Sequence, residues 1–454
     1  MSPAQPTVRG RSHSAVIALL STLVLFLGFY ANAWAVVPQS DFVNFQHDSE
    51  SLVMARMVES RDHGIFSHNG LLGRGDATLE DLSEPVYAHQ YDVFLSGGVF
   101  QYYSLYKSAS GGQAFFFSLL HGLSPLAAKS ELGVFRALLA LMMALTLALF
   151  IAWLAEEFDV VTAVFVGFLA ALSPWLTLFA HNMFYFIWAS FLPLGLMAWL
   201  LARQSRMDRP WVFGPAVLAS AAILFKCVMN GYDFIIAALS MPVIPFFYYA
   251  IRDHWDGSRF VRQAGLLFAG IAAAVVLSIL LLAWQLAASE GGFISALANI
   301  LATLGRRTYF ADPRLLPDYA AAVRATPWWD VLWTYAVQDS AVGWIRLSFL
   351  GLIGLFAAAT IAYLPLRRTR PDLIANKDKS RALIAVTWLA LLVPVSWFVL
   401  FKGQAVVHTH TNFLAWYMPF TLFGTAMMAW LVRNIAAAFA RGTGKLPTPN
   451  DMVR

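Results

Sequence analysis

Ten apolar segments, each close to 20 residues long, limit what this chain can fold into. A helix of roughly 20 residues is what a hydrocarbon core of about 30 Å requires. The chain of 454 residues is 59% hydrophobic and 13% charged, whereas soluble domains carry about 25% charged residues. We therefore predict an all-α polytopic membrane protein of about ten transmembrane helices. The expected spans are residues 15–37, 133–154, 160–180, 183–202, 211–229, 233–251, 263–287, 344–365, 382–401 and 412–432.

Short clusters of arginine and lysine orient these spans. They precede the first span and follow the fourth, sixth, eighth and tenth. Cytoplasmic loops are enriched in these residues, so the clusters predict that both termini are cytoplasmic. The acidic EEFD loop after the second span gives no support, but acidic residues contribute little to this rule. Because the basic residues are dispersed in this way, the pI near 9.3 does not indicate a nucleic-acid partner.

The first span has two interpretations. Its basic start, its apolar core and the sequence ANAWA are typical of a secretory signal with an A-x-A cleavage site. If it is not cleaved, the same stretch continues to Val37 and is long enough to cross the membrane. We expect a retained anchor, because removal would leave nine spans and no anchor beside the acidic stretch that follows.

Two long segments, residues 38–132 and 289–343, are expected to be external loops of one integral membrane domain. The first contains FFFSLLHGL, which is too short to span and predicts an interfacial or re-entrant helix with Gly111 and Gly112 at its start. The second contains TPWWDVLWTY, whose tryptophans suit the membrane-water interface. No internal repeat of the kind seen in many transporters is evident.

The stretch VNFQHDSESLVMARMVES, residues 43–60, places acidic side chains just after the first span. Its apolar positions recur with helical spacing and predict an amphipathic helix that begins near Asp48 and lies along the membrane surface. Asp48 can cap this helix, and it can also act as a general base toward an acceptor hydroxyl. Glu50 and Asp41 are the next candidates for the base, Asp41 because it is closer to the first span.

An acidic residue in the external loop after the first transmembrane helix resembles the arrangement of the GT-C superfamily of integral membrane glycosyltransferases. The run His47-Asp48-Ser49-Glu50, leading into LVMARM, is similar to the "DE" or "HDE" start in aminoarabinose transferases and protein O-mannosyltransferases. In that family the aspartate is the base or orients the acceptor. Ser49 departs from the commonest pattern, which has an acidic residue there. The motif covers about a dozen residues, and the rest of the resemblance is architectural.

The resemblance implies a function and a location. GT-C enzymes take sugars from polyprenyl-phosphate or polyprenyl-diphosphate carriers, so the expected partners are this donor, a glycan, lipid or protein acceptor, and the bilayer. The segments KSASGGQAFFFSLLHGL and FKGQAVVHTHTNFLAWYMPF are similar to parts of GT-C-like proteins from bacterial polysaccharide loci. This implies a bacterial inner membrane with the active site on the periplasmic side.

The resemblance leaves metal dependence open, because related enzymes divide into metal-dependent and metal-independent groups. Mg²⁺ and Mn²⁺ require several oxygen ligands. Asp41, Asp48 and Glu50 offer only a partial set. The sequence therefore indicates no certain cofactor.

Polar residues near the ends of other spans are candidates for binding the donor phosphate. Preorganised cations and hydrogen-bond donors stabilise a departing phosphate. We expect four of them to gather at the outer end of the last two spans: Lys402, His408, His410 and Asn412. The plainer interpretation is that the lysine extends to the interface and the histidines end a helix.

Four further residues are candidates on the same side. Lys226 lies within an apolar segment, where a lysine is costly and often functional, although it can also form an interfacial ion pair with Asp233. Arg306 and Arg307 can hold a diphosphate or remain solvated. His181 can bind sugar hydroxyls or belong to an interfacial turn.

Two other classes of protein stay open. A flippase or transporter would need charged residues inside its spans, and here only Lys226 approaches that position. A polysaccharide polymerase or ligase also uses lipid-linked sugars and relies on external arginines, as Arg306 and Arg307 would be.

Overall fold

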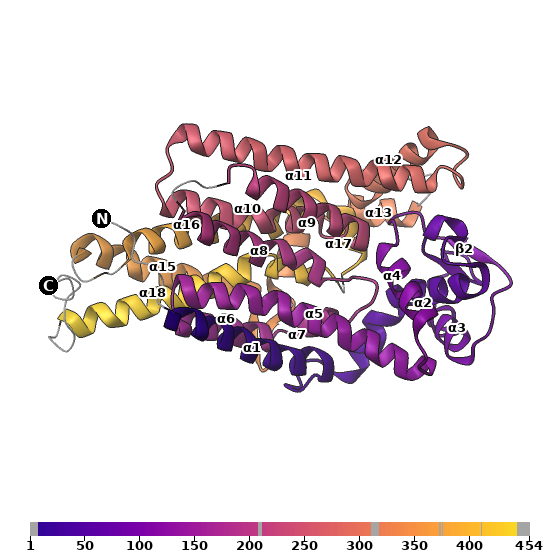
Figure 1. Ribbon diagram of the computed structural model, residues 1–454, viewed down its shortest axis with the longest axis horizontal. Helices are drawn as coiled ribbons and strands as arrows, with labels where there is room; N and C mark the ends of the chain where they lie inside the picture. Colours follow the sequence, from indigo (N-terminus) through magenta and orange to yellow (C-terminus); the bar gives the residue numbers. More distant parts are fainter. Residues whose placement is uncertain are drawn as a thin grey trace.

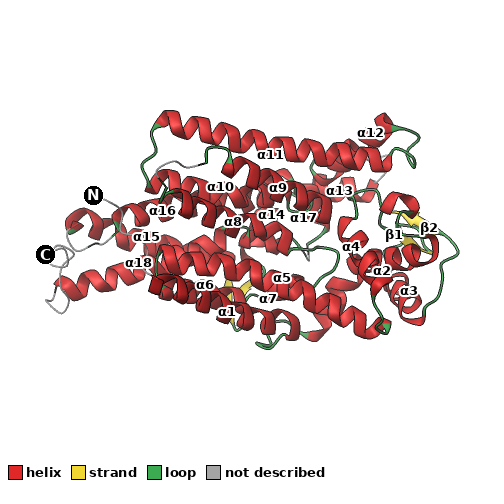
Figure 2. Cartoon of the chain, in the orientation of Figure 1, coloured by secondary structure: helices red, strands yellow, loops and turns green. Residues whose placement is uncertain are grey.

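The computed structural model describes residues 8–207, 211–309, 317–371, 374, 376–409 and 411–442. Long helices lie side by side in a bundle, and a smaller helical region covers one end of it (Figure 1). Strands in the described ranges form two short antiparallel pairs, β1-β2 and β3-β4 (Figure 2). The predicted all-α class is therefore confirmed, with these two pairs as additions.

Among the described residues, eleven helices form the bundle. They are α1 (Val8–Ala31), α5 (Ala128–Glu157), α6 (Val160–Ala171), α7 (Pro174–Ala180), α8 (Trp188–Gln204), α9 (Gly214–Asn230), α10 (Ile235–Arg252), α11 (Gly257–Leu286), α15 (Phe349–Thr369), α16 (Lys377–Leu400) and α18 (Phe420–Gly442).

The remaining elements lie between these helices along the chain. Between α1 and α5 are α2 (Gln39–His63), η1 (Ser67–Gly70), β1 (Gly73–Gly75), α3 (Glu84–Ser96), β2 (Tyr103–Leu105) and α4 (Gly112–Leu123). Between α11 and α15 are α12 (Phe293–Arg307), α13 (Pro317–Ala325), α14 (Trp328–Val337), β3 (Ser340–Val342) and β4 (Ile345–Ser348). Between α16 and α18 are α17 (Lys402–Val407) and η3 (Asn412–Tyr417).

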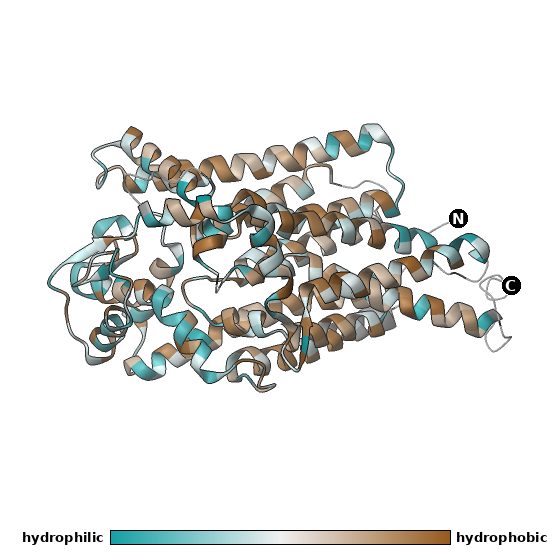
Figure 3. Ribbon diagram, turned by 180° about the vertical axis from the view of Figure 1, so that it is seen from behind, coloured by the Kyte–Doolittle hydropathy of each residue, from teal (hydrophilic) through white to brown (hydrophobic). Residues whose placement is uncertain are grey.

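Seven helices in the described residues are long and apolar enough to cross a membrane, and α6 with α7, bent by 67°, makes an eighth if the pair is one span. Hydrophobic residues fill the middle of the bundle, and hydrophilic ones gather at its ends (Figure 3). The predicted count of about ten is not confirmed. Both α8 and α9 have 17 residues, a rise of about 26 Å, just below the roughly 30 Å of the hydrocarbon core.

The two ends of the bundle differ. α1 begins and α18 ends at one of them, which we call the terminal end (Figure 1). α2, α3 and α4 lie at the opposite end together with α12 and α13, and we call this the cap end. The first long segment and the start of the second, α12 and α13, therefore lie at the same end of the molecule.

Ion pairs at the terminal end account for the acidic EEFD loop. The Glu157 carboxylate is buried and accepts hydrogen bonds from Arg252 at 2.8 Å, and Lys379 lies 3.5 Å from it. Asp159 pairs with Arg433. The acidic loop thus neutralises basic residues of α10, α16 and α18, a pairing that the order of residues along the chain does not reveal.

The cap is built around α2. Every residue from Ser49 to Ser60 is buried, because α3, α4, β1 and η1 surround the helix. The predicted amphipathic helix is therefore wrong for residues 49–60, which are buried on every side, while its position at the membrane surface stays a prediction. The predicted short helix is α4, and it begins at Gly112 after Gly111, whose φ of 70° favours glycine. A Cβ at Gly112 would collide with the backbone of Val228, so the glycine lets α4 pack on α9.

Candidate functional site

α2 begins directly after Pro38, which places the acidic candidates differently from the prediction. Asp41 lies in the first turn, whereas Asp48 follows the first helical residue, Gln39, by nine positions. Asp48 therefore does not cap α2, and the predicted helix start is wrong. A proline at the entry and an acidic residue in the first turn are ordinary start signals. The sequence VVPQSDF contains both.

Glu50 is fully buried where α2 meets α3 and α5. Its carboxylate accepts hydrogen bonds from the Tyr91 hydroxyl at 2.8 Å and the Met183 N–H at 2.9 Å, and it pairs with Arg136 at 2.5 Å. Burial alone would raise the pKa of Glu50, but the charge of Arg136 and these hydrogen bonds outweigh burial and lower it. An ionised and fully paired carboxylate is a weak base, so this geometry favours Glu50 as an anchor of the cap.

Asp48 is half-buried and lies near two tyrosines. Burial raises the pKa of Tyr185 well above its usual value, and the negative charge of Asp48 adds to this effect. Burial also raises the pKa of Tyr87. The charge of Arg74 lowers this pKa, and the charge of Asp48 raises it. Asp48 therefore lies within electrostatic reach of both phenol groups. Asp41 lies closer to the start of the helix. Burial raises the pKa of Asp339, and the charge of Asp41 raises it further.

Tyr185 connects the surroundings of Asp48 with a second group of charges. It lies in the turn between α7 and α8, where the charges of Asp233 and Tyr106 act on its pKa after burial and Asp48. The Thr411 side chain hydrogen-bonds to Tyr185 and lowers that pKa. We call Tyr106 and Tyr185 the tyrosine pair. The sequence gives no signal for either residue, because they are two of 15 tyrosines in the chain.

A buried ion pair lies beside the tyrosine pair. Arg307 donates to the Asp233 carboxylate at 2.7 Å, and both side chains are buried. The Lys226 ammonium donates to the backbone carbonyls of Gly231 at 2.8 Å and Asp233 at 2.6 Å. The expected Lys226–Asp233 ion pair is thus replaced: the lysine closes the turn between α9 and α10, and the arginine takes the carboxylate.

Lys402 and Arg306 join this group because α12 and α17 touch at a glycine. The Gly403 N–H donates to the Thr308 carbonyl at 2.8 Å. A Cβ at Gly403 would overlap the carbonyls of Arg306 and Thr308, so only glycine permits this approach. Lys402 is buried, and its ammonium lies 5.2 Å from the centre of the Tyr309 ring.

We call Lys226, Arg306, Arg307 and Lys402 the cationic cluster. Asp233 neutralises one of its four positive charges, so the cluster as a whole is positive. It faces the tyrosine pair: burial raises the pKa of Tyr106, while Arg307 and Arg306 oppose that rise. Asp48 therefore acts on Tyr185, and the two arginines of α12 act on Tyr106.

Residues predicted near the last two spans stabilise the turn after α17. Asn412 is buried, and its amide donates to the His408 carbonyl at 2.6 Å while its oxygen accepts from the Trp397 indole at 2.8 Å. His408 is half-buried at the end of α17. His410 lies outside the described residues. The neighbouring Thr411 reaches Tyr185, so this turn borders the site.

His181 is buried at the end of α7. Its Nδ1 lies 2.9 Å from the Phe29 carbonyl, to which it donates as a neutral ring. Burial lowers the pKa of His181 to about 4, so the imidazole is uncharged at neutral pH. The ring also contacts Phe42, and it joins α1, α2 and α7. A role in binding sugar hydroxyls stays a prediction.

The carboxylates of α2 are also the candidates for metal ligands. In the part of the chain that the structure describes, no group of three or more His, Cys, Asp or Glu side chains is placed to hold a metal ion. Glu50, one of the three carboxylates of the predicted partial set, is paired with Arg136.

No family model and no curated protein matches this chain.

Proposed function

We propose that this protein is a membrane glycosyltransferase of the GT-C type. It would move a sugar from a polyprenyl-phosphate or polyprenyl-diphosphate carrier to an acceptor hydroxyl at the cap end. One arrangement supports this proposal: Asp48 acts on the buried Tyr185, and Tyr106, which acts on the same phenol, is in turn acted on by Arg307 and Arg306. A base opposite an anion-binding group is what displacement of a phosphate from a sugar requires.

The chemistry is a single displacement. Asp48 accepts the proton of the acceptor hydroxyl while the hydroxyl oxygen attacks the anomeric carbon. The bond between that carbon and the phosphate oxygen breaks, and the phosphate leaves with the electron pair. Attack opposite the leaving group inverts the anomeric centre. Arg306 and Lys402 stabilise the negative charge of the phosphate, while Arg307, held by Asp233, fixes the end of α12 beside them.

The test replaces Asp48→Asn in proteoliposomes that contain a polyprenyl-phosphate sugar and an acceptor glycan. Transfer should fall about 10²- to 10⁴-fold, the usual contribution of a positioned base, while donor binding stays unchanged. Asp92→Asn is the matched control, because Asp92 is exposed on α3 in the same cap. Transfer by the Asp48 variant at the parent rate would remove Asp48 as the base. Activity after chelation would also exclude an essential Mg²⁺ or Mn²⁺.

The cationic cluster also supports a second candidate function, that of a polysaccharide polymerase or ligase. In that case Arg306→Ala would abolish activity while Asp48→Asn would leave most of it. A glycosyltransferase predicts the opposite ranking, with Arg306→Ala raising mainly the KM for the donor. The hydrogen bonds of Lys226 to two backbone carbonyls disfavour a flippase, because they commit its ammonium to a turn.

A further inference from the structure

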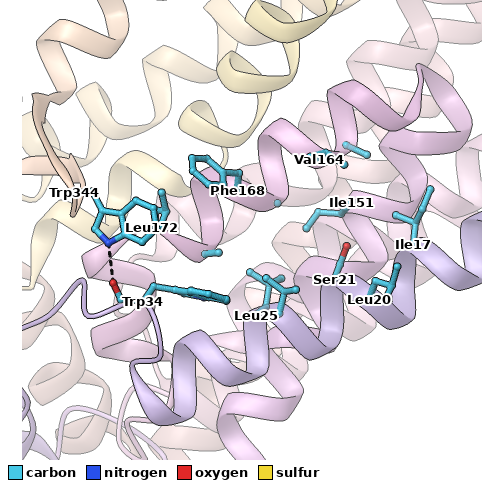
Figure 4. Close-up of a pocket in the computed structure, with 14 residues that line it drawn as sticks. Ile17, Leu20, Ser21, Leu25, Trp34, Ile151, Val164, Phe168, Leu172 and Trp344 are labelled. Carbon is cyan, nitrogen blue, oxygen red and sulfur yellow. Dashed lines mark hydrogen bonds between the residues drawn. The ribbon is translucent and has the colours of Figure 1, made fainter.

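A cavity of about 300 Å³ opens on the flank of the bundle, away from the site described above. α1 supplies one wall, α6 supplies the other, and Ile151 of α5 forms part of the floor (Figure 4). The indoles of Trp34 and Trp344 lie at one end, and the Trp344 N–H donates to the Trp34 carbonyl at 2.8 Å.

Small residues on α6 create this space. Ala163, Gly167 and Ala171 line the cavity at intervals of four residues and so share one face of the helix. A Cβ at Gly167 would lie 3.6 Å from the end of the Ile151 side chain, which is ordinary van der Waals contact. Larger side chains at these positions would occupy the cavity.

The chemistry of the lining is apolar. Of its 14 residues none is charged, and the polar groups are the Ser21 hydroxyl and the two indoles. A charged or sugar-like ligand would lose its hydration there without gaining partners. The cavity therefore suits a hydrocarbon.

The surroundings of the cavity indicate where that hydrocarbon comes from. Leu20, Val164 and Phe168 at its rim are 56%, 58% and 57% exposed, respectively. Leu20 belongs to α1, which is long and apolar enough to span the membrane, and the other two belong to α6, which is so together with α7. Exposed apolar side chains on such helices face lipid. The opening is continuous with this lipid-facing surface, and lipid chains reach it directly.

The length of the cavity indicates which kind of hydrocarbon chain it can hold. From Ile17 to Leu25 it follows α1 for eight residues, roughly 12 Å. This is close to half of a hydrocarbon core of about 30 Å, the depth of one leaflet. The tryptophans at the end where α1 leaves the bundle suit the membrane interface. A polyprenyl chain longer than a leaflet would extend far beyond this space.

We infer that the cavity binds one acyl chain of a bilayer phospholipid, with the head group beside Trp34 and Trp344. The bound lipid would stabilise the connection between α1 and α2. It does not depend on the proposed transferase activity, since it rests only on the helices that face lipid.

The test uses vesicles of phosphatidylethanolamine and phosphatidylglycerol that contain a phospholipid with a photoactivatable diazirine on one acyl chain. After illumination, labelled peptides are mapped by mass spectrometry. We expect the strongest labelling at residues 17–25 and 163–172. Gly167→Leu should reduce it about tenfold, the low end of the effect of one misfitting methylene in an apolar pocket. Gly354→Leu is the matched control, because Gly354 is exposed on α15 with open space around it.

Four results would overturn the inference. Labelling could be uniform over all lipid-facing helices, or unaffected by Gly167→Leu. Unlabelled polyprenyl phosphate could compete better than phospholipid, which would make the occupant an isoprenoid. Ser21→Cys could crosslink two chains, which would assign the cavity to a second copy. If Gly167→Leu does not fold, Gly167→Ala replaces it, since a Cβ fits there, and a graded loss of labelling is expected.

Discussion

Asp48 and Glu50 are separated by two positions on α2, and this spacing turns their side chains apart by roughly 200°. Glu50 consequently points at Arg136 and Tyr91 inside the protein, whereas Asp48 is half-buried near Tyr185. Their residue types do not distinguish them, because both are carboxylates in the same acidic run. The contacts do: the Glu50 carboxylate is fully buried and paired with Arg136, whereas Asp48 is half-buried.

Replacing Glu50→Gln should destabilise the protein by about 3 kcal/mol. This is the low end for breaking a buried ion pair, because Arg136 retains 26% exposure of its side chain. The thermal midpoint in detergent measures the loss. The control is Glu84→Gln, since that carboxylate is 58% exposed beside His47 and its loss should cost about 0.5 kcal/mol or less.

Acidification provides a second readout of the same variant. The pKa of Glu50 is lowered in the folded protein, so its contribution to stability is present above the unfolded value of 4.5 and is lost as pH falls through the folded pKa. The parent should therefore lose stability below about pH 4.5, and Glu50→Gln should lose less. Parallel curves for the two proteins would contradict this role.

Among the elements, the length of an apolar segment predicts the position of a helix better than an amphipathic pattern does. α5, α11 and α16 lie where 20-residue apolar runs predict them, because span length depends only on the local chain. α2 was predicted with the wrong start and the wrong surroundings, because the elements that bury its polar positions include α3 and α4 farther along the chain. The fourth predicted span begins late for a similar reason: Asn182 and its neighbours fold into a turn that packs on α2.

α17 depends on a glycine for its position. Gly403→Ala should force α17 away from the carbonyls that end α12, at a cost of about 1–3 kcal/mol. If the transferase proposal holds, this movement separates Lys402 from Arg306, and the KM for the donor should rise although no charge is removed. Gly122→Ala on α4 is the control, because nothing lies near its Cβ position. An unchanged KM in the Gly403 variant would mean that the two cations do not act together.

At the scale of the whole molecule, the sequence predicts the order of the apolar helices and the two long segments between them. It does not predict which residues of those segments meet. Asp233 and Arg307 are 74 positions apart, and Lys402 lies beside the end of α12 only because α17 packs on it. Such pairings depend on how the helices are arranged in three dimensions, and the polar residues alone do not encode that arrangement.

The arrangement of the two ends makes a prediction about membrane sidedness. Cys227 is buried, so the parent should not react with a membrane-impermeant maleimide. Asp92→Cys in the cap should react in intact cells. Ser205→Cys lies at the end of α8 between Arg203 and Arg206, and it should react only after permeabilisation. Both positions are exposed. The reverse pattern would invert the orientation, and reaction of both in intact cells would contradict a membrane-spanning bundle.

The hydrogen bond between the Trp344 indole and the Trp34 carbonyl joins residues 310 positions apart. At a synthesis rate of about 5–20 residues per second, Trp344 leaves the ribosome roughly 15–60 s after Trp34. During that interval the connection between α1 and α2 lacks the hydrogen bond from the Trp344 indole. This contact is thus formed late in biogenesis, and a chain that stalls before residue 344 would lack it.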